Sequence, residues 1–237
     1  MKYSIIIPVY NEERRTPKTI GQIFDFFKKY QNDVEIIFVN DGSVDKTKKI
    51  LEDYQKQYQF KIISYQPNRG KGYAVKQGAL VAQGDWVIFF DIDLATPLVE
   101  FDHLLAFLKQ GDEVVIGSRR VRGANLAKKE SWLRTFLGSG FTKLSNILVP
   151  GIKDFTCGFK CFSRSAVVQI FPRARIDRWG FDTELLYIAH LRKLPIRQMP
   201  VTWIHDDDSR VKVLKAVISS FRELIQMFYH RCRGFYR

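Results

Sequence analysis

Short apolar runs alternate with helix-like segments throughout the first half of the chain. The runs have the length and the β-branched and aromatic content of buried strands, and the segments between them are long enough for helices. Strands this apolar, separated by helices, are typical of a parallel sheet that is covered on both faces. The expected strands are 3–9, 34–40, 60–65, 86–91 and 113–117, and the expected helices are 17–30, 45–58, 72–82 and 97–110.

The alternation breaks after Ser118, where the chain becomes basic and loop-like as far as residue 156. No linker, repeat or low-complexity tract separates the two halves. We therefore predict one α/β domain over residues 1–210, with a mostly parallel central sheet flanked by helices. The elements expected in its second half and beyond are a helix at 131–147, a strand at 158–162, a helix at 180–192, a strand at 196–203 and a helix at 211–230.

Residues 211–237 are predicted to form a basic amphipathic helix with a short tail. Apolar side chains recur there at the i, i+3, i+4, i+7 spacing that places them on one helical face. Such a stripe packs either on its own domain or, with cations around it, at the headgroup level of a membrane, and the sequence leaves both readings open. The stripe consists of Leu214, Val217, Ile218, Phe221, Leu224, Ile225 and Phe228, and the cations opposite are Lys212, Lys215, Arg222 and Arg231.

The chain is strongly basic. Its 237 residues carry 38 Lys and Arg against 25 Asp and Glu, a net charge of +13. This excess points to an anionic partner, which is a nucleic acid, a phosphorylated small molecule or an acidic membrane surface. The sequence has no zinc-finger spacing, no RNA-binding aromatic motif and no isolated basic arm, so nucleic-acid binding is not expected.

The cysteine content and the hydropathy of the chain indicate the cellular compartment in which we expect the protein. Cys157, Cys161 and Cys232 are too few for a disulfide framework, and we expect plain thiols in a reducing compartment. No stretch approaches the roughly 18 uncharged apolar residues of a membrane span, and no secretory signal precedes the first expected strand. We therefore expect a cytoplasmic protein that is soluble or peripheral on a membrane.

Acidic residues follow the expected strands at their carboxyl ends, where open parallel sheets bind ligands. The fourth run ends in DIDLATP, and Asp91 and Asp93 would share one face if the strand continued that far. Two close carboxylates repel unless a cation neutralises them, and Mg²⁺ or Mn²⁺ typically takes one or two carboxylates together with phosphate oxygens. The alternative is a strand-end turn in which one Asp caps the following helix.

Two loops nearby have both a chemical and an ordinary interpretation. Asp41 either opens an Asx-type turn or accepts a hydrogen bond from a ring N–H of a nucleobase. The NRGKG segment at 68–72 offers glycines and cations ahead of a helix. It is either a backbone nest for phosphate oxygens or a flexible surface loop.

Taken in order along the chain, these segments resemble family 2 glycosyltransferases of the GT-A fold. The resemblance is carried by PVYNE (8–12), NDGSVDKT (40–47), NRGKGYAVKQG (68–78), DIDLATP (91–97) and GSR (117–119). KDFTCGFKCFSR (153–164), WGFDTELLYIA (179–189) and VTWIHDDDSRV (201–211) resemble the polyprenyl-phosphate glucosyltransferase branch. Related mannosyltransferases typically carry Gln two residues after the second Asp, where this chain has Ala95.

The resemblance implies an activity. It is the inverting, metal-dependent transfer of a hexose, glucose by branch, from a UDP-sugar to a polyprenyl phosphate (dolichyl or undecaprenyl) at the cytoplasmic face of a membrane. The alternatives are polyprenyl-phosphate mannose synthesis from GDP-mannose and transfer to a saccharide hydroxyl. The sequence does not reveal the hexose, the polyprenol, the choice between Mg²⁺ and Mn²⁺, or the oligomeric state.

The resemblance also implies roles for single residues. The uridine and ribose would be held by Pro8, Tyr10, Glu12 and Asp41, and Lys71 would lie near the nucleotide. Asp91 and Asp93 would bind the diphosphate, Asp93 directly through the metal. The acceptor phosphate would meet Arg119, Arg134, Ser209 and Arg210, the last standing where the family pattern has Lys. The catalytic set would be Asp93, Asp182, Arg119 and Arg134.

Asp182 and His205 each have two interpretations. In relatives that glycosylate a hydroxyl, an acidic residue near Asp182 acts as the general base, whereas an ordinary role at this position is an N-terminal helix cap. A lipid phosphate is mostly ionised near neutral pH, so that acceptor requires no strong base. His205 either reaches the metal or belongs to a solvated acidic turn with residues 206–208.

Overall fold

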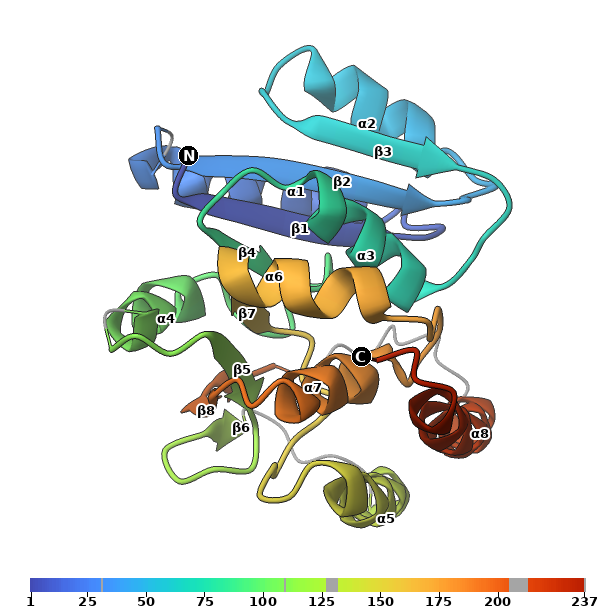
Figure 1. The fold of residues 1–237 in the computed structure, drawn as a ribbon. Coiled ribbons are helices and arrows are strands. Elements are labelled where there is room, and N and C mark those ends of the chain that lie inside the picture. Colours follow the sequence, from blue (N-terminus) through green and yellow to red (C-terminus); the bar gives the residue numbers. More distant parts are fainter. Residues whose placement is uncertain (31, 109, 127–131, 205–212, 237) are drawn as a thin grey trace.

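The fold is built on a seven-stranded sheet in the order β3-β2-β1-β4-β7-β5-β8 (Figure 1). Every strand of this sheet runs in the same direction except β7, which is antiparallel to both β4 and β5. The strands are β1 (Tyr3–Val9), β2 (Val34–Asp41), β3 (Lys61–Tyr65), β4 (Trp86–Phe89), β5 (Val114–Ser118), β7 (Lys160–Ser163) and β8 (Ile196–Pro200), and a separate parallel pair joins β6 (Asn125–Leu126) to β9 (Thr202–Trp203).

Helices cover both faces of the sheet. The computed structural model describes residues 1–30, 32–108, 110–126, 132–204 and 213–236, and within the helices the side chains at 132–137, 213–218 and 220 fall outside that description. The helices are α1 (Thr16–Phe27), α2 (Thr47–Gln55), α3 (Lys71–Val81), α4 (Glu100–Leu108), α5 (Trp132–Leu148), α6 (Arg164–Ile170), α7 (Phe181–Leu191) and α8 (Val213–Cys232), with 3-10 turns η1 (Lys28–Tyr30) and η2 (Phe171–Arg173).

The alternation of side chains along β1 explains the layers. Ile6 points into a core shared with α3, α6 and α7, which lie in front of the sheet in Figure 1. Ile5 and Ile7 point into a second core, which is shared with α1, α2 and α4. All three isoleucines are fully buried, because a strand covered on both faces has no solvent side. The predicted α/β architecture is therefore confirmed.

Several predicted boundaries were wrong where a strand meets a loop. β4 ends at Phe89, so Asp91 and Asp93 lie in a turn instead of on one face of a strand, with Leu94 at a φ of 52°. Helix α4 begins at Glu100 and not at residue 97. Helix α1 begins at Thr16 and not at residue 17, and the buried Oγ1 of Thr16 has no hydrogen-bond partner among the described residues.

Among its described side chains, the C-terminal helix packs on the domain along one side. Glu223 and Met227 are buried against α7 and its leading loop, and Tyr236 of the tail donates a hydrogen bond to Glu184 at 2.5 Å. Much of the predicted apolar stripe faces outward, since Ile225 is 72% exposed and Phe228 is 59% exposed. The predicted boundary at residues 210 and 211 falls outside the described residues.

The remaining sequence-based expectations concern short elements and thiols. Helix α6 and the β6–β9 pair were not predicted, because a helix of seven residues and strands of two residues carry too little periodicity to detect. Cys157 and Cys161 are free and buried, and Cys232 is free and exposed, as expected of plain thiols. Within the described part of the chain, no helix combines the length and the apolar character needed to cross a membrane.

Candidate active site

The loops that follow β1 and β2 are joined by hydrogen bonds at the carboxyl edge of the sheet. Asn11 N donates to Ser43 Oγ at 2.9 Å, and Val44 N donates back to Asn11 Oδ1 at 2.9 Å. Glu12 N donates to Thr47 Oγ1 at 2.8 Å. The short polar side chains of the second loop thus satisfy the backbone of the first, and the two loops form one rigid rim.

This rim carries three of the predicted nucleotide-binding residues. Pro8 lies half-buried near the end of β1, and the Tyr10 ring is 46% exposed just beyond it. The Glu12 carboxylate forms an ion pair with Arg15 at 2.7 Å. An exposed aromatic ring beside an anchored carboxylate offers a stacking face and a hydrogen-bond acceptor at the same edge.

Asp41, at the end of β2, is only 3% exposed and is held by the loop before α3. Its carboxylate accepts hydrogen bonds from Asn68 Nδ2 at 2.7 Å, from Arg69 N at 2.8 Å and from Gly70 N at 2.8 Å. The amides that we considered as a phosphate nest thus donate to a protein carboxylate in this structure. Gly70 adopts a φ of 118°, which side chains rarely allow, so the turn requires glycine.

Asp91 and Asp93 lie beside the ammonium group of Lys71. Lys71 Nζ is 2.5 Å from Asp91 Oδ1. Burial opposes the charge of Lys71, yet Asp91, Asp182 and Asp93 together raise its pKa. Burial and the neighbouring Asp91 raise the pKa of Asp93, whose Oδ1 accepts a hydrogen bond from Ala95 N at 3.0 Å. The turn therefore places two carboxylates close together at a partly exposed position.

Because Gly158 has no side chain, the Asp91 side chain can occupy the space beside it. A Cβ atom added at Gly158 would lie 2.2 Å from Asp91 Oδ2, well inside the van der Waals limit. The loop before β7 therefore approaches the acidic turn so closely that only glycine fits. Gly158 was not among the predicted site residues.

Lys160 is a second functional candidate that the sequence analysis missed. It is fully buried on β7, where its Nζ donates to Asp182 Oδ1 at 2.6 Å and to the carbonyl of Cys157 at 2.5 Å. Burial raises the pKa of Asp182, and the charges of Lys160 and Lys71 oppose that shift. A single lysine inside the apolar segment GFKCF was the available signal, because lysine is rarely buried without an acidic partner.

Asp182 lies in the first turn of α7 and does not cap it. The residue at the N-cap is Gly180, and the Asp182 carboxylate is engaged with Lys160. The helix-cap interpretation is therefore wrong. Whether Asp182 acts as a base depends on the acceptor.

Arg119 is anchored by a buried carboxylate. Its Nε and Nη2 atoms donate to Asp154 Oδ2 at 2.7 Å and to Asp154 Oδ1 at 2.9 Å, and Nη2 also donates to Thr156 Oγ1 at 2.8 Å. The guanidinium carbon lies 5.4 Å from the centre of the Trp203 ring. Although burial opposes ionisation, Arg119 holds the pKa of Asp154 well below its usual range. The charge of Arg119 is thus fixed at the end of β5.

Four predicted residues are not placed. His205, Ser209 and Arg210 lie outside the described residues. Arg134 lies in α5, but its side chain is also outside the description. Their assignments to the metal and to the acceptor phosphate stay predictions.

Asp91 and Asp93 are the described residues best suited to a divalent cation. Two carboxylates, one of them with a raised pKa, satisfy what a hard cation needs when phosphate oxygens and water complete its shell. Across the described ranges, no three His, Cys, Asp or Glu side chains gather closely enough to hold a metal by themselves. The donor set therefore fits a metal that is shared with a bound diphosphate.

Comparison with known proteins gives consistent findings. The model of Glycosyl transferase family 2 matches residues 4–171. The chain is 33% identical to the dolichyl-phosphate beta-glucosyltransferase of Dictyostelium discoideum, over 99% of this chain and 76% of that protein. It is 34% identical to the Homo sapiens protein of the same name, over 88% of this chain and 69% of that protein.

Solved structures share the fold at lower identity. Glucosyl-3-phosphoglycerate synthase of Mycobacterium tuberculosis, in complex with Mn²⁺, UDP-glucose and phosphoglyceric acid, superposes with a TM-score of 0.71. Its identity is 21%, and the match covers 98% of this chain and 79% of that one. TarS 1–349 of S. aureus gives a TM-score of 0.60 at 15% identity, over 98% of this chain and 73% of that one. At these identities the likeness concerns the fold alone.

Proposed function

Because this chain belongs to glycosyltransferase family 2 and has the GT-A fold, we propose that it transfers glucose, with inversion, from UDP-glucose to a polyprenyl phosphate. The observation that carries this proposal is the identity of 33–36% over nearly the whole chain with proteins named dolichyl-phosphate beta-glucosyltransferase. That the chain is a glycosyltransferase follows from the family. The donor, the acceptor and the roles of single residues belong to the proposal.

The donor would lie along the carboxyl edge of β1, β2 and β4. Tyr10 and Asp41 would contact the uridine, and Pro8 and Glu12 would line the ribose. Asp91 and Asp93 would hold Mg²⁺ or Mn²⁺, which when bound neutralises the charge that develops on the departing diphosphate. The Lys71 ammonium, 2.5 Å from Asp91 in this structure, lies where it can also contact a phosphate oxygen.

The nucleophile would be a phosphate oxygen that is already ionised. The ion pair between Asp182 and Lys160 supports this choice, because the 2.6 Å hydrogen bond from the buried Lys160 ammonium occupies an Asp182 oxygen that a general base would use to take a proton from the acceptor. Arg119, fixed by Asp154, would orient the acceptor phosphate together with Arg134, Ser209 and Arg210. These residues would then orient the acceptor phosphate and would not need to deprotonate it.

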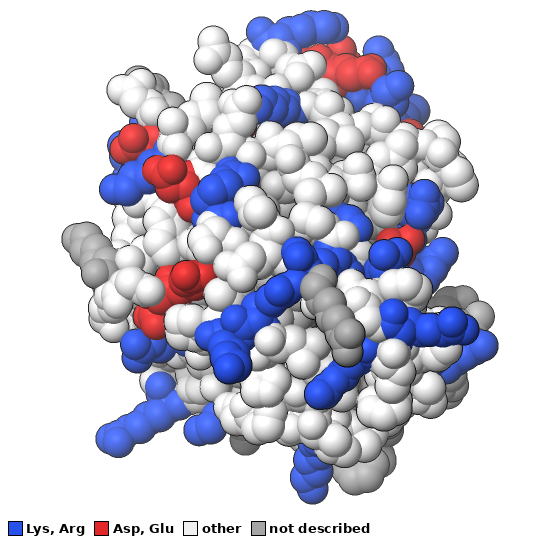
Figure 2. Space-filling model, viewed as in Figure 1, with Lys and Arg blue, Asp and Glu red and all other residues white. Residues whose placement is uncertain are grey.

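A lipid acceptor requires a membrane surface, and helices α5 and α8 offer one. They pack against each other and expose large apolar side chains, including Ile147 at 75% and Ile225 at 72%. Figure 2 shows that Lys and Arg outnumber Asp and Glu on the lower half of the drawn face, where these helices lie in Figure 1. Apolar side chains among cations suit the headgroup region of an anionic leaflet, so we place the enzyme as a peripheral protein on the cytoplasmic face.

The proposal is tested by product analysis. The purified chain would be incubated with Mg²⁺ or Mn²⁺, a short polyprenyl phosphate and either UDP-glucose, UDP-galactose or GDP-mannose, and lipid-linked sugar would be followed by mass. We expect a glucosyl lipid from UDP-glucose. Asp93→Asn should lower its rate at least about 100-fold, on the scale of a lost electrostatic contact to the transition state. Asp33→Asn removes an exposed carboxylate and serves as the matched control.

The outcome separates the alternatives. A lipid product from GDP-mannose alone would replace the glucosyltransferase assignment with a mannosyltransferase. No lipid product with any donor would overturn the acceptor assignment.

Transfer to a saccharide hydroxyl is the second candidate, and it is favoured by the burial of Asp182, which raises the pKa of that carboxyl and makes it a stronger base. If Asp182 is a general base, Asp182→Asn should reduce turnover by about 10²–10⁴-fold. With a phosphate acceptor the reduction should be far smaller. Comparison of the two acceptors with this one variant distinguishes them.

A further inference from the structure

A pocket of about 270 Å³ lies between residues 175–178 and α8, outside the proposed donor and acceptor sites. The residues that line it include three arginines, Arg175, Arg178 and Arg222, and two acidic residues, Asp177 and Glu223. We propose that this pocket binds the phosphate of an acidic phospholipid headgroup. The inference rests on the proposed membrane association, and not on the sugar that is transferred.

The arginines of this pocket, here called the arginine pocket, are available to an anion. Among the described residues, neither Arg178 nor Arg222 forms an ion pair or a side-chain hydrogen bond. The guanidinium of Arg175 lies 4.4 Å from the centre of the Phe235 ring, so an aromatic face fixes its position without neutralising its charge. Guanidinium groups present forked N–H donors that match phosphate oxygens.

The two carboxylates of the arginine pocket are already engaged. Glu223 Oε2 accepts a hydrogen bond from Gly180 N at 2.6 Å, and its Oε1 accepts one from Ser219 Oγ at 3.1 Å. Asp177 Oδ2 is 3.2 Å from a guanidinium nitrogen of Arg69, which lies on the loop before α3. The field inside the pocket is therefore positive.

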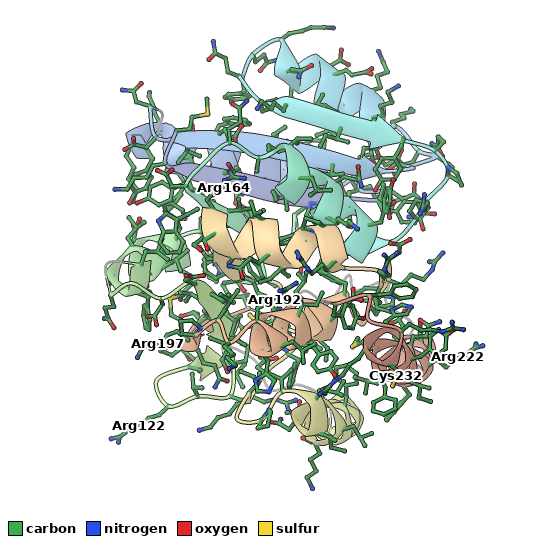
Figure 3. All side chains as sticks on the ribbon, in the orientation of Figure 1. Arg122, Arg164, Arg192, Arg197, Arg222 and Cys232 are labelled. Atoms are coloured by element: carbon green, nitrogen blue, oxygen red, sulfur yellow. The ribbon has the colours of Figure 1, made fainter. Side chains whose placement is uncertain are left out.

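The surroundings of the arginine pocket indicate which kind of phosphate it takes. Ile225 lies three residues after Arg222 on the same helix, and Phe228 follows three residues later, at 72% and 59% exposure. Residues three apart are neighbours on a helix, so a cation and two apolar side chains follow one another along α8. Figure 3 shows Arg222 on the side of α8 that is turned away from the sheet. A phospholipid combines a phosphate with acyl chains and would use both features.

The pocket volume agrees with a headgroup. A water molecule takes about 30 Å³ of liquid, so 270 Å³ holds several times the volume of one water. A phosphate with part of its glycerol fits such a space, whereas an inorganic phosphate would leave much of it to water.

The test compares charge removed at the arginine pocket with equal charge removed elsewhere. Binding of the full chain to vesicles of phosphatidylcholine, with and without phosphatidylglycerol, would be measured by flotation. The pocket variant is Arg178→Gln/Arg222→Gln. The control is Arg122→Gln/Lys18→Gln, since Arg122 is exposed on the side opposite α8 in Figure 3 and Lys18 is exposed on α1. Urea midpoints would verify that both variants fold.

We expect the pocket variant to bind phosphatidylglycerol vesicles about 30-fold more weakly, as two interfacial cations imply, and the control to bind nearly as the wild type does. Equal losses in the two variants would indicate attraction by overall charge and would overturn the proposal. A second arm titrates inorganic phosphate and glycerol 3-phosphate by calorimetry. Pocket-dependent binding of these without a preference for acidic vesicles would assign the pocket to a soluble phosphate and would also overturn the lipid assignment.

The outcome of the vesicle experiment does not depend on the proposed glucosyltransferase activity. With a short polyprenyl phosphate in detergent, the pocket variant should transfer sugar as the wild type does. If the pocket variant loses vesicle binding but retains sugar transfer, the result supports lipid binding at the arginine pocket. If the wild-type chain transfers no sugar, the result counts only against the proposed enzyme activity.

Discussion

Asp41 and Asp93, in residues 1–118, accept hydrogen bonds from backbone N–H groups, whereas Asp154 and Asp182, in residues 119–237, each form an ion pair with a cationic side chain. Asp41 accepts hydrogen bonds from the backbone N–H groups of Arg69 and Gly70, and Asp93 accepts one from the backbone N–H of Ala95. In the second half, Asp154 pairs with Arg119 and Asp182 pairs with Lys160. The first arrangement builds a rigid rim from neutral donors, and the second fixes charges in the interior.

The difference has an energetic consequence. A carboxylate that loses one of several neutral donors keeps the others, and the cost is that of one unsatisfied buried group. A buried ion pair that loses one partner leaves an uncompensated charge, which costs more. We therefore expect the removal of one partner to lower the free energy of unfolding more for the ion pairs of residues 119–237 than for the hydrogen-bonded carboxylates of residues 1–118.

The largest expected effect is that of Lys160→Met. It removes the ammonium group that pairs directly with the buried Asp182 and should lower the free energy of unfolding by about 3–5 kcal/mol. Lys160→Met/Asp182→Asn removes both charges and should recover part of this loss. Urea denaturation measures both, with Lys29→Met as the control, because the pair of Lys29 with Asp102 is exposed and should be worth about 1 kcal/mol or less. If Lys160→Met and Lys29→Met lowered the free energy of unfolding equally, the proposed difference between the buried and the exposed ion pair would be contradicted.

A smaller effect is expected for Asp41→Asn in the first half. The Asn side chain keeps one acceptor oxygen, so at least one of the donors at residues 68–70 loses its partner. The free energy of unfolding should fall by about 1–3 kcal/mol. Urea denaturation would be compared with that of Asp33→Asn, where the side chain is exposed. If the two variants were equally stable, the rim would not depend on Asp41.

The smallest effect concerns acid pH. Arg119 holds the pKa of Asp154 below the ordinary value of 3.8 despite burial. Below pH 3.8 the unfolded chain takes up a proton at Asp154 that the folded chain does not. Stability from this group is therefore complete well above that pH and is lost as the pH falls toward the lowered pKa.

The check is the slope of stability against pH. One proton changes the free energy of unfolding by at most about 1.4 kcal/mol per pH unit. Urea midpoints measured from about pH 5 downward should fall less steeply in Asp154→Asn than in the wild type. Parallel slopes would show that Asp154 titrates alike in the folded and unfolded chains.

The two halves also differ in how much the sequence could predict. The strands of the first half and the polar residues at their ends were found because each is a local pattern of a few residues. The turn at Asp91 and Asp93 was misplaced by the length of the apolar run, since hydrophobicity alone does not mark where Phe89 ends the hydrogen-bonded ladder. In α8, periodicity identified the helix but left open whether the apolar stripe packs on the domain, and the exposure of Ile225 and Phe228 was seen only in the structure.

By itself the sequence determined a parallel α/β sheet with acidic residues at its carboxyl edge, because apolar periodicity and strand-end composition are properties of neighbouring residues. Only the tertiary structure decided which charges meet. Lys160 and Asp182 are 22 residues apart, and Arg119 and Asp154 are 35 apart. Packing brings each of these pairs together across strands and helices, and burial then makes the pairing obligatory, since an isolated charge is not stable in the interior.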